Sequence, residues 1–135
     1  MTDATTNLTM QELFGDVIYS YTRTQALEDG VLVDLNQWIP VNESGYKFPV
    51  ACTAGVFAII EKAVNNKYQC NDYKGVIWDI LWMSKVHQIQ KWETGALFTV
   101  KITGAARQSL FTFKIECGPG DSGEPVLTIS LPDED

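Results

Sequence analysis

Histidine and clustered cysteine are nearly missing from this chain. Among 135 residues there is one histidine, His87, and the three cysteines, Cys52, Cys70 and Cys117, form no CxxC pair. Zinc sites need four N, S or O ligands and usually draw several His or Cys residues at short spacing. The composition therefore predicts no metal and no other cofactor. It also predicts structural thiols of the kind that stay reduced in the cytosol.

Long apolar runs are lacking as well. No run approaches the roughly 18 to 20 apolar residues that span a bilayer. The first residues, MTDATTNLTM, lack the basic and apolar regions of a signal peptide. No internal repeat or long linker divides the chain. We therefore expect one cytoplasmic domain over residues 1–135 that does not contact a membrane, with a leader at 1–9 and an acidic tail at 132–135.

Positive charge is scarce at both ends of the chain. Up to Gly45 there are seven acidic residues and one base, Arg23, and from Glu116 onward there are six acids and no base. Residues 46–115 carry nine bases and four acids, and the formal net charge of the chain is −7. Solvated domains usually intersperse their charges, so this pattern predicts long-range electrostatics, internal or with a partner. Acidic ends also disfavour direct binding to nucleic acid or to an anionic membrane.

The N-terminal third predicts a strand–helix–strand unit. Residues 17–21 (VIYSY) alternate as a strand does, and residues 22–25 spell T-x-x-Q, the capping box of a short helix. Gly30 supplies the positive φ of a C-terminal stop, and residues 31–35 (VLVDL) continue as an extended segment. Before this unit, residues 10–14 favour one helical turn.

Two long helices and a sheet are predicted after that unit. Apolar residues recur at helical spacing from Val50 to about Asn65 and from Asp72 to about Trp92. The period then changes to 2 in three segments, around Val100, Phe113 and Ile129. The expected fold class is α+β. It is a two-layer domain in which a C-terminal three-stranded antiparallel meander packs against the two long helices, beside the N-terminal strand–helix–strand unit.

The second predicted helix carries more apolar surface than one buried stripe needs. Trp78, Trp82, Val86 and Ile89 lie on a flank beside the one expected to cover the sheet. Either the N-terminal unit covers them, or they form an interface, because aromatic residues concentrate at interface cores. A homodimer is one form that such an interface would take.

Residues 120–123 spell GDSG, the sequence around the nucleophile of trypsin-like proteases. That mechanism needs a histidine base and an aspartate that orients it, and here the single histidine falls inside a predicted helix. We interpret the segment as a turn between two strands. It is not a phosphate loop either, because such loops lead into the N-terminus of a helix.

Two alternatives to a binding role stay open. A small enzyme would need an acid–base or Mg²⁺ site built from the N-terminal carboxylates with Arg23. These carboxylates are Asp16, Glu28, Asp29 and Asp34. No nucleophile–base pair accompanies them, so we expect no enzyme. Lysines and aromatic residues also interleave in residues 62–92, as in proteins that bind single-stranded nucleic acid. They form no single helical stripe, and pairing with the acidic ends is the simpler use.

Residues 14–35, FGDVIYSYTRTQALEDGVLVDL, resemble the signature of an uncharacterised family, known only as a domain of unknown function. Its members are small proteins carried by phages, plasmids and other mobile elements. The family brings no established activity, cofactor or catalytic residue. The resemblance implies a context, because accessory genes of mobile elements often encode inhibitors of host machinery that act in the cytoplasm of a bacterial cell.

We therefore expect a binding protein whose acidic surface inhibits a host defence nuclease complex of the CRISPR or restriction type. Its partner would be a host protein or a ribonucleoprotein complex. The candidate interaction residues combine signature positions, the tryptophan flank and the C-terminal turn. They are Asp16, Tyr19, Tyr21, Arg23, Glu28, Asp29, Asp34, Trp78, Trp82, Asp121 and Glu124.

Overall fold

The computed structural model describes residues 21–134. In chain order the elements are α3 (Arg23–Asp29), β1 (Leu32–Asp34), the 3₁₀ turns η1 (Leu35–Gln37) and η2 (Val41–Glu43), β2 (Val50–Thr53), α4 (Ala54–Asn65), α5 (Tyr73–Val86), β3 (Gln88–Trp92), β4 (Gly95–Lys101), β5 (Leu110–Pro119) and β6 (Pro125–Ser130). The expected leader, the helical turn at 10–14 and all but the last residue of the strand at 17–21 lie outside the described residues. So do Asp16 and Tyr19.

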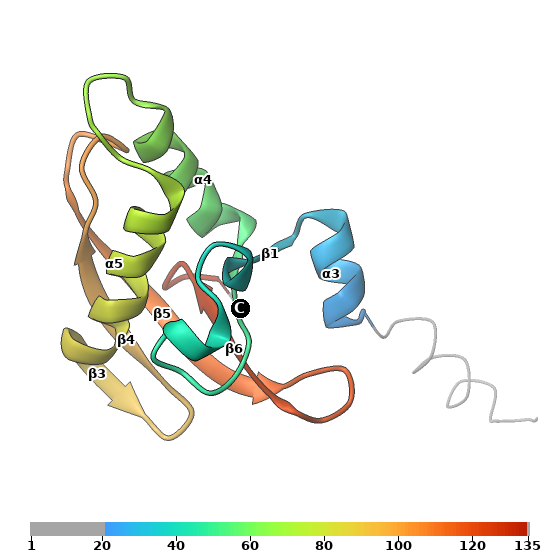
Figure 1. Cartoon of the computed structure of the whole chain (residues 1–135). Coiled ribbons are helices and arrows are strands. Elements are labelled where there is room, and N and C mark those ends of the chain that lie inside the picture. Colours follow the sequence, from blue (N-terminus) through green and yellow to red (C-terminus); the bar gives the residue numbers. More distant parts are fainter. Residues whose placement is uncertain (1–20, 135) are drawn as a thin grey trace, which may run out of the picture.

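The strands of the described chain form one six-stranded mixed sheet in the order β1-β2-β6-β5-β4-β3 (Figure 1). β2 pairs in parallel with β6, with Val50 opposite Leu127, and every other pairing is antiparallel. The α+β class is confirmed, but the expected three-stranded meander is too small. β4, β5 and β6 do form an antiparallel run, and β3 extends it on one side while β2 and β1 extend it on the other.

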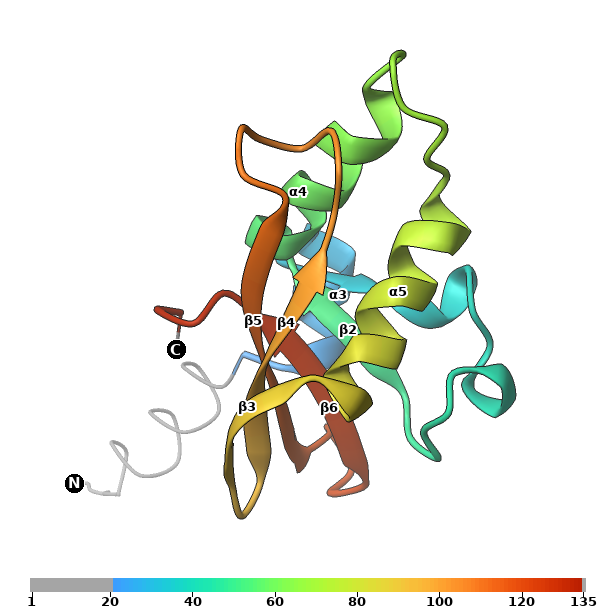
Figure 2. The same ribbon diagram turned by 90° about the vertical axis from the view of Figure 1, so that its left-hand side faces the viewer.

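One face of this sheet carries the core. Alternate residues of β4 and β5 are buried on it, and the rings of Phe98 and Phe113 meet edge to face with centroids 6.0 Å apart. α4 and α5 cover this face (Figure 2), and Ile60 and Ile80 are among the helix residues that pack into the core. The two-layer arrangement thus follows from the period of 2 in the strands and the period of 3.6 in the helices.

Both long helices are shorter than the sequence predicts. Residues 50–53 form the buried strand β2, and the Thr53 hydroxyl then accepts a hydrogen bond from the Val56 amide to cap α4. α5 has Asp72 as its N-cap, close to the expected start, but it ends at Val86. Residues 88–92 pair with β4 as a hairpin instead. The strand ladder, which is a tertiary interaction, overrides the local helical spacing at both places.

α3 forms as the sequence predicts. Thr22 and Gln25 make both hydrogen bonds of the capping box, and Gly30 ends the helix in the left-handed region with φ 79°. Residues 32–34 then form β1, while Leu35 starts a 3₁₀ turn. α3 buries only Ala26, so little apolar packing holds this helix.

The acidic C-terminal segment folds back onto the sheet. The Glu134 carboxylate accepts hydrogen bonds from the Thr53 hydroxyl and the Leu131 amide, both at 2.7 Å. Its carbonyl oxygen accepts one from Lys114 Nζ at 2.6 Å. Residue 134 is therefore part of the folded domain. None of the helices in residues 21–134 has the length and apolar character needed to cross a membrane.

Candidate interaction surfaces

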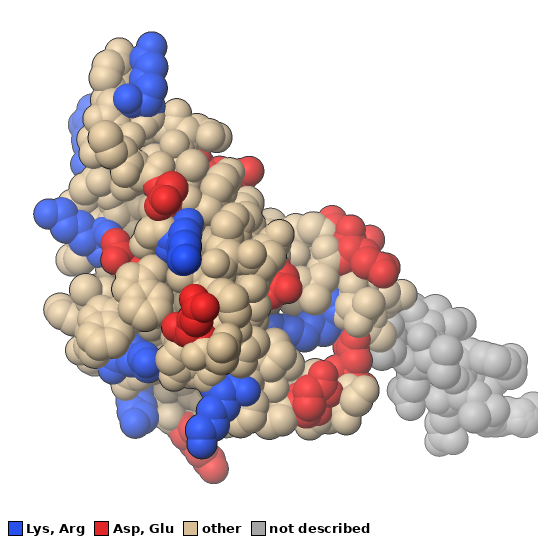
Figure 3. All heavy atoms as spheres, in the orientation of Figure 1, with Lys and Arg blue, Asp and Glu red and all other residues tan. Residues whose placement is uncertain are grey.

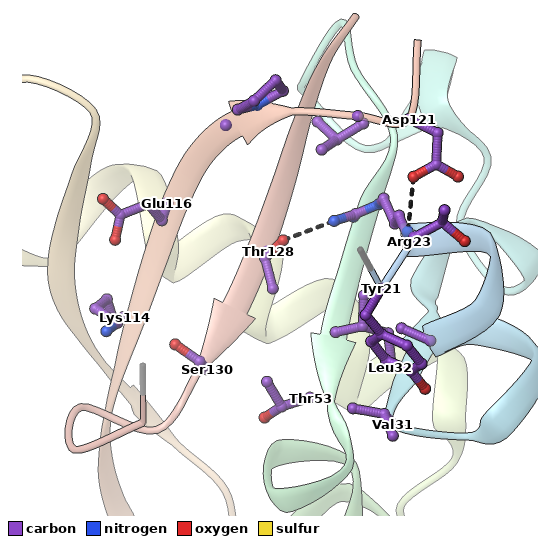
Figure 4. A pocket seen from close by; sticks show the side chains of 16 residues that line it. Tyr21, Arg23, Val31, Leu32, Thr53, Lys114, Glu116, Asp121, Thr128 and Ser130 are labelled. Carbon is purple, nitrogen blue, oxygen red and sulfur yellow. Dashed lines mark hydrogen bonds between the residues drawn. The ribbon is translucent and has the colours of Figure 1, made fainter. Parts of the chain in front are cut away.

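Arg23 attaches α3 to the face of the sheet that the long helices leave open. Its Nη1 donates to Thr128 Oγ1 at 2.8 Å (Figure 4). Its Nη2 donates to the Leu127 carbonyl, also at 2.8 Å. Thr128 alternates with Leu127 and Ile129, which face the core, so Arg23 lies on the opposite side. Partial burial lowers the pKa of this guanidinium, and the carboxylates of Asp34, Asp121 and Glu124 oppose that shift.

Asp121 holds the N-terminus of α3 from the other side. Its carboxylate accepts hydrogen bonds from the Arg23 amide (2.7 Å), the Thr24 amide (3.0 Å) and the Thr24 hydroxyl (2.6 Å). These bonds, with the Thr24 hydroxyl first, lower the pKa of Asp121. The GDSG segment is therefore a turn between β5 and β6 whose aspartate caps a distant helix, in agreement with the turn interpretation.

A groove of about 760 Å³ lies between α3 and the open face of the sheet. Figure 4 shows Lys114, Glu116, Thr128 and Ser130 on its floor, on the neighbouring strands β5 and β6. Glu116 accepts hydrogen bonds from the Thr94 hydroxyl and the Trp92 indole. The floor of the groove carries polar side chains of mixed charge from the faces of strands, while apolar side chains such as Val31, Leu32 and Val126 form other parts of its lining.

The acidic candidates of the described chain gather around α3. Glu28, Asp29, Asp34, Asp121 and Glu124 are all exposed. Several also have a structural contact, since Asp29 accepts a hydrogen bond from the Tyr21 hydroxyl at 2.6 Å and Asp34 accepts one from the Asn36 amide. Glu124 accepts one from the Ser122 amide within its own turn. The bond to Asp29 raises the pKa of Tyr21.

Charge is partly segregated in space. Figure 3 shows a group of acidic atoms over α3 and the adjoining turns at one end of the molecule. Most of the basic side chains on this face lie at the other end, over α5, β3 and the loop between α4 and α5, where acidic side chains also lie among them. The end around α3 is therefore mainly acidic, and the other end carries both signs.

Trp78 and Trp82 form the second candidate surface, on the outer side of α5. The two side chains are 42% and 47% exposed, and their rings stack with centroids 6.2 Å apart. The described part of the N-terminal unit, α3 and β1, lies at the opposite edge of the sheet and does not cover them (Figure 1). This exposure favours the interface interpretation, while the homodimer stays a prediction.

No metal site is evident in residues 21–134, where no three His, Cys, Asp or Glu side chains are grouped suitably for an ion. Of the acids that the enzyme alternative would use, Asp34 caps the 3₁₀ turn η1 and Asp29 accepts the hydrogen bond from Tyr21. Burial raises the pKa of the Cys52 thiol to about 12, which keeps it in the unreactive protonated form.

Several residues at these surfaces were missed by sequence reasoning. In the sequence, Thr128, Lys114 and Ser130 indicate only the polar side of alternating strands, and Glu134 only part of an acidic tail. The alternation of polar and apolar residues in the strands indicates a polar face. It does not indicate that α3, about a hundred residues earlier in the chain, packs against that face.

A family model described as "Family of unknown function (DUF6573)" matches residues 10–135 of the chain. The match therefore includes α3, the groove, the tryptophan surface and the folded C-terminal segment. No curated protein and no solved structure matches the chain.

Proposed function

We propose that this chain, which belongs to the DUF6573 family of unknown function, acts by binding a positively charged surface of another macromolecule rather than by catalysis. One observation carries the proposal. The exposed carboxylates of α3 and the adjoining turns gather at one end of the domain, and most lysines lie elsewhere (Figure 3). Such a field steers a basic partner toward one face of the molecule.

The way in which α3 is held supports a binding role. Asp121 fixes the first turn of the helix and Arg23 ties it to β6, so Glu28 and Asp29 are carried on a helix anchored at one end. A surface that is ordered before binding loses less conformational entropy on association. The carboxylates therefore form a prearranged acidic face.

The partner that we propose is a nuclease complex of a host defence system, either a CRISPR effector or a restriction enzyme. Proteins that hold nucleic acid neutralise its phosphates with lysine and arginine, so their channels offer a basic surface of the required charge. The resemblance of residues 14–35 to accessory proteins of mobile elements is the reason for choosing this class of basic partner over others.

The test measures inhibition of cleavage and binding affinity with purified nuclease complexes, from roughly 50 to 500 mM salt, where the Debye length falls from above 10 Å to below 5 Å. We expect inhibition of one such complex and an affinity that falls steadily as salt rises. An affinity that does not change with salt would contradict binding through the acidic face.

A matched pair of variants separates the acidic face from net charge. Glu28→Gln with Glu124→Gln changes the face, whereas Glu61→Gln with Glu93→Gln changes the net charge equally at exposed positions elsewhere. Exposed ion pairs contribute about 0.2–1 kcal/mol each, so the first variant, which removes two carboxylates, should bind roughly 2- to 30-fold more weakly. The second should bind like the natural chain, and equal effects from both variants would contradict the proposal.

A further inference from the structure

A hollow of about 460 Å³ lies between the start of α5 and the segment that holds η2. It shares no lining residue with the groove beside α3. Ile39, a buried residue, and Gly75, which has no side chain, form part of its wall. The remaining lining residues are Glu43, Asp72, Lys74 and Trp78.

Two carboxylates and an aromatic ring meet in this hollow. Glu43 and Asp72 are exposed, and Trp78 is 42% exposed. Asp72 Oδ1 accepts a hydrogen bond from the Gly75 amide at 2.8 Å, whereas its Oδ2 accepts none within residues 21–134. Carboxylates and the face of an indole ring both attract a cation, and the indole favours one that is also flat and weakly hydrated.

The neighbouring turn of α5 already shows this kind of contact. Lys85 Nζ lies 5.6 Å from the centroid of the Trp82 ring and 5.5 Å from that of the Tyr46 ring. No lysine or arginine of residues 21–134 lies over Trp78 in the same way. Of the two stacked tryptophans, Trp82 therefore has a lysine ammonium group over its ring, and Trp78 has no such partner within residues 21–134.

We propose that the hollow beside Trp78 binds an arginine side chain of a protein partner. The planar guanidinium stacks on the indole while its N–H groups donate to the carboxylates of Glu43 and Asp72. Lys74 also lines the hollow, and its positive charge repels a bound cation and lowers the affinity. The proposal rests on the hollow and its lining, and it holds whether or not the acidic face around α3 is used.

The probe is N-acetyl-arginine amide, titrated into the full ¹⁵N-labelled chain and followed by NMR, with N-acetyl-citrulline amide as the neutral isostere. We expect saturable shifts at the Trp78 indole N–H and the Gly75 amide, with a dissociation constant in the millimolar range. The citrulline compound should cause none. Shifts confined to residues around α3, or equal shifts from both compounds, would overturn the proposal without touching the salt-dependent binding tested above.

Two charge variants should change the affinity for the arginine compound in opposite directions, which a non-specific effect would not do. Glu43→Gln should weaken binding of the arginine compound roughly 2- to 5-fold, and Lys74→Gln should strengthen it by a similar factor. Trp78→Leu should abolish the shift at Gly75, whereas the matched Trp82→Leu should leave it. Equal losses in the two tryptophan variants, or weaker binding in Lys74→Gln, would overturn the assignment. The charge variants alter exposed side chains, so they decide the matter even if a tryptophan variant fails to fold.

Discussion

Single polar residues of this protein often have two roles, one in the fold and one at the surface. Asp121 is exposed and adds charge to the acidic face, yet its carboxylate accepts three hydrogen bonds from the first residues of α3. Arg23, by contrast, is a partly buried cation close to acidic side chains. Its guanidinium donates two hydrogen bonds that hold the helix on the sheet. Changes at such residues affect stability and charge together, so their tests must separate the two.

Stability should depend on the ionisation of Asp121. Its pKa is lowered in the folded chain, so its contribution is present above the unfolded value of about 3.9 and is lost as the pH falls through the lower folded value. We expect Asp121→Asn to flatten the loss of stability below about pH 4, measured as the urea midpoint at successive pH values. Asp133→Asn, at another exposed acid, should keep the natural profile. A flattened profile in the control would contradict this assignment.

The cysteines should differ sharply in reactivity. Cys52 is fully buried with a pKa raised to about 12, while Cys70 is exposed. Iodoacetamide at pH 8 should label Cys70 first and Cys52 only when the chain unfolds, because the thiolate is the reacting form. Mass spectrometry of peptides from the native and urea-treated chain measures this. Labelling of both residues at one rate in the native chain would show that β2 is not buried as described.

Among the elements, α3 depends least on apolar burial. It is held by its capping box, by Gly30 at its C-terminus and by polar contacts at its N-terminus, and it buries only Ala26. A helix of this length is not stable alone in water, so these polar contacts decide whether it stays in place. α4 and α5, by contrast, are held by the core.

Removing the Arg23 guanidinium should release α3. Arg23→Met keeps much of the side-chain volume but leaves Thr128 Oγ1 and the Leu127 carbonyl without this donor. Lost hydrogen bonds of this kind cost about 1–3 kcal/mol. We expect a decrease in that range in the free energy of unfolding, with faster amide exchange in residues 23–29. Arg107→Met, at an exposed arginine, is the control, and equal effects from both would contradict the role of Arg23.

At the scale of the whole molecule, the acidic face around α3 lies at one end of the domain, and most basic side chains on the same side lie toward the other end (Figure 3). The tryptophan surface lies on α5, in the region richer in lysine, away from the acidic face. Association through the two regions should therefore respond differently to salt. Binding of a basic partner at the acidic face weakens as charges are screened, whereas packing of Trp78 and Trp82 against a second copy of the chain depends on apolar burial.

A homodimer over Trp78 and Trp82 would bring like charges together. Lys74 and Lys85 are eleven residues apart, three helical turns on one flank of α5. An antiparallel pair of α5 helices centred on the tryptophans would place Lys85 of one copy opposite Lys74 of the other. Such a dimer should therefore strengthen with salt in sedimentation experiments. Trp82→Glu should prevent it while shifting Tm by about 3 °C or less, because the side chain is outside the core. An unfolded variant would contradict that placement.

Local interactions of this protein were determined by the sequence alone. The capping box at Thr22 and the stop at Gly30 each involve residues within a few positions of one another, and both are confirmed. The sequence also predicts the alternation of β4, β5 and β6, because in a strand with one buried face every second residue is apolar. The helical period of 3.6 likewise indicated the apolar flank of Trp78 and Trp82, because the helix carries more apolar residues than one buried face needs.

Only the tertiary structure decided the rest, because the partners concerned lie far apart in the chain. β2 pairs in parallel with β6, and residues 88–92 pair with β4. Both pairings depend on hydrogen bonds between strands that the local sequence period does not predict. The groove exists because Arg23 meets Thr128 and Asp121 meets Thr24, contacts that span 105 and 97 residues. Each of these side chains is ordinary in its own segment, and only the packing of α3 against β6 and the turn before it gives them a common site.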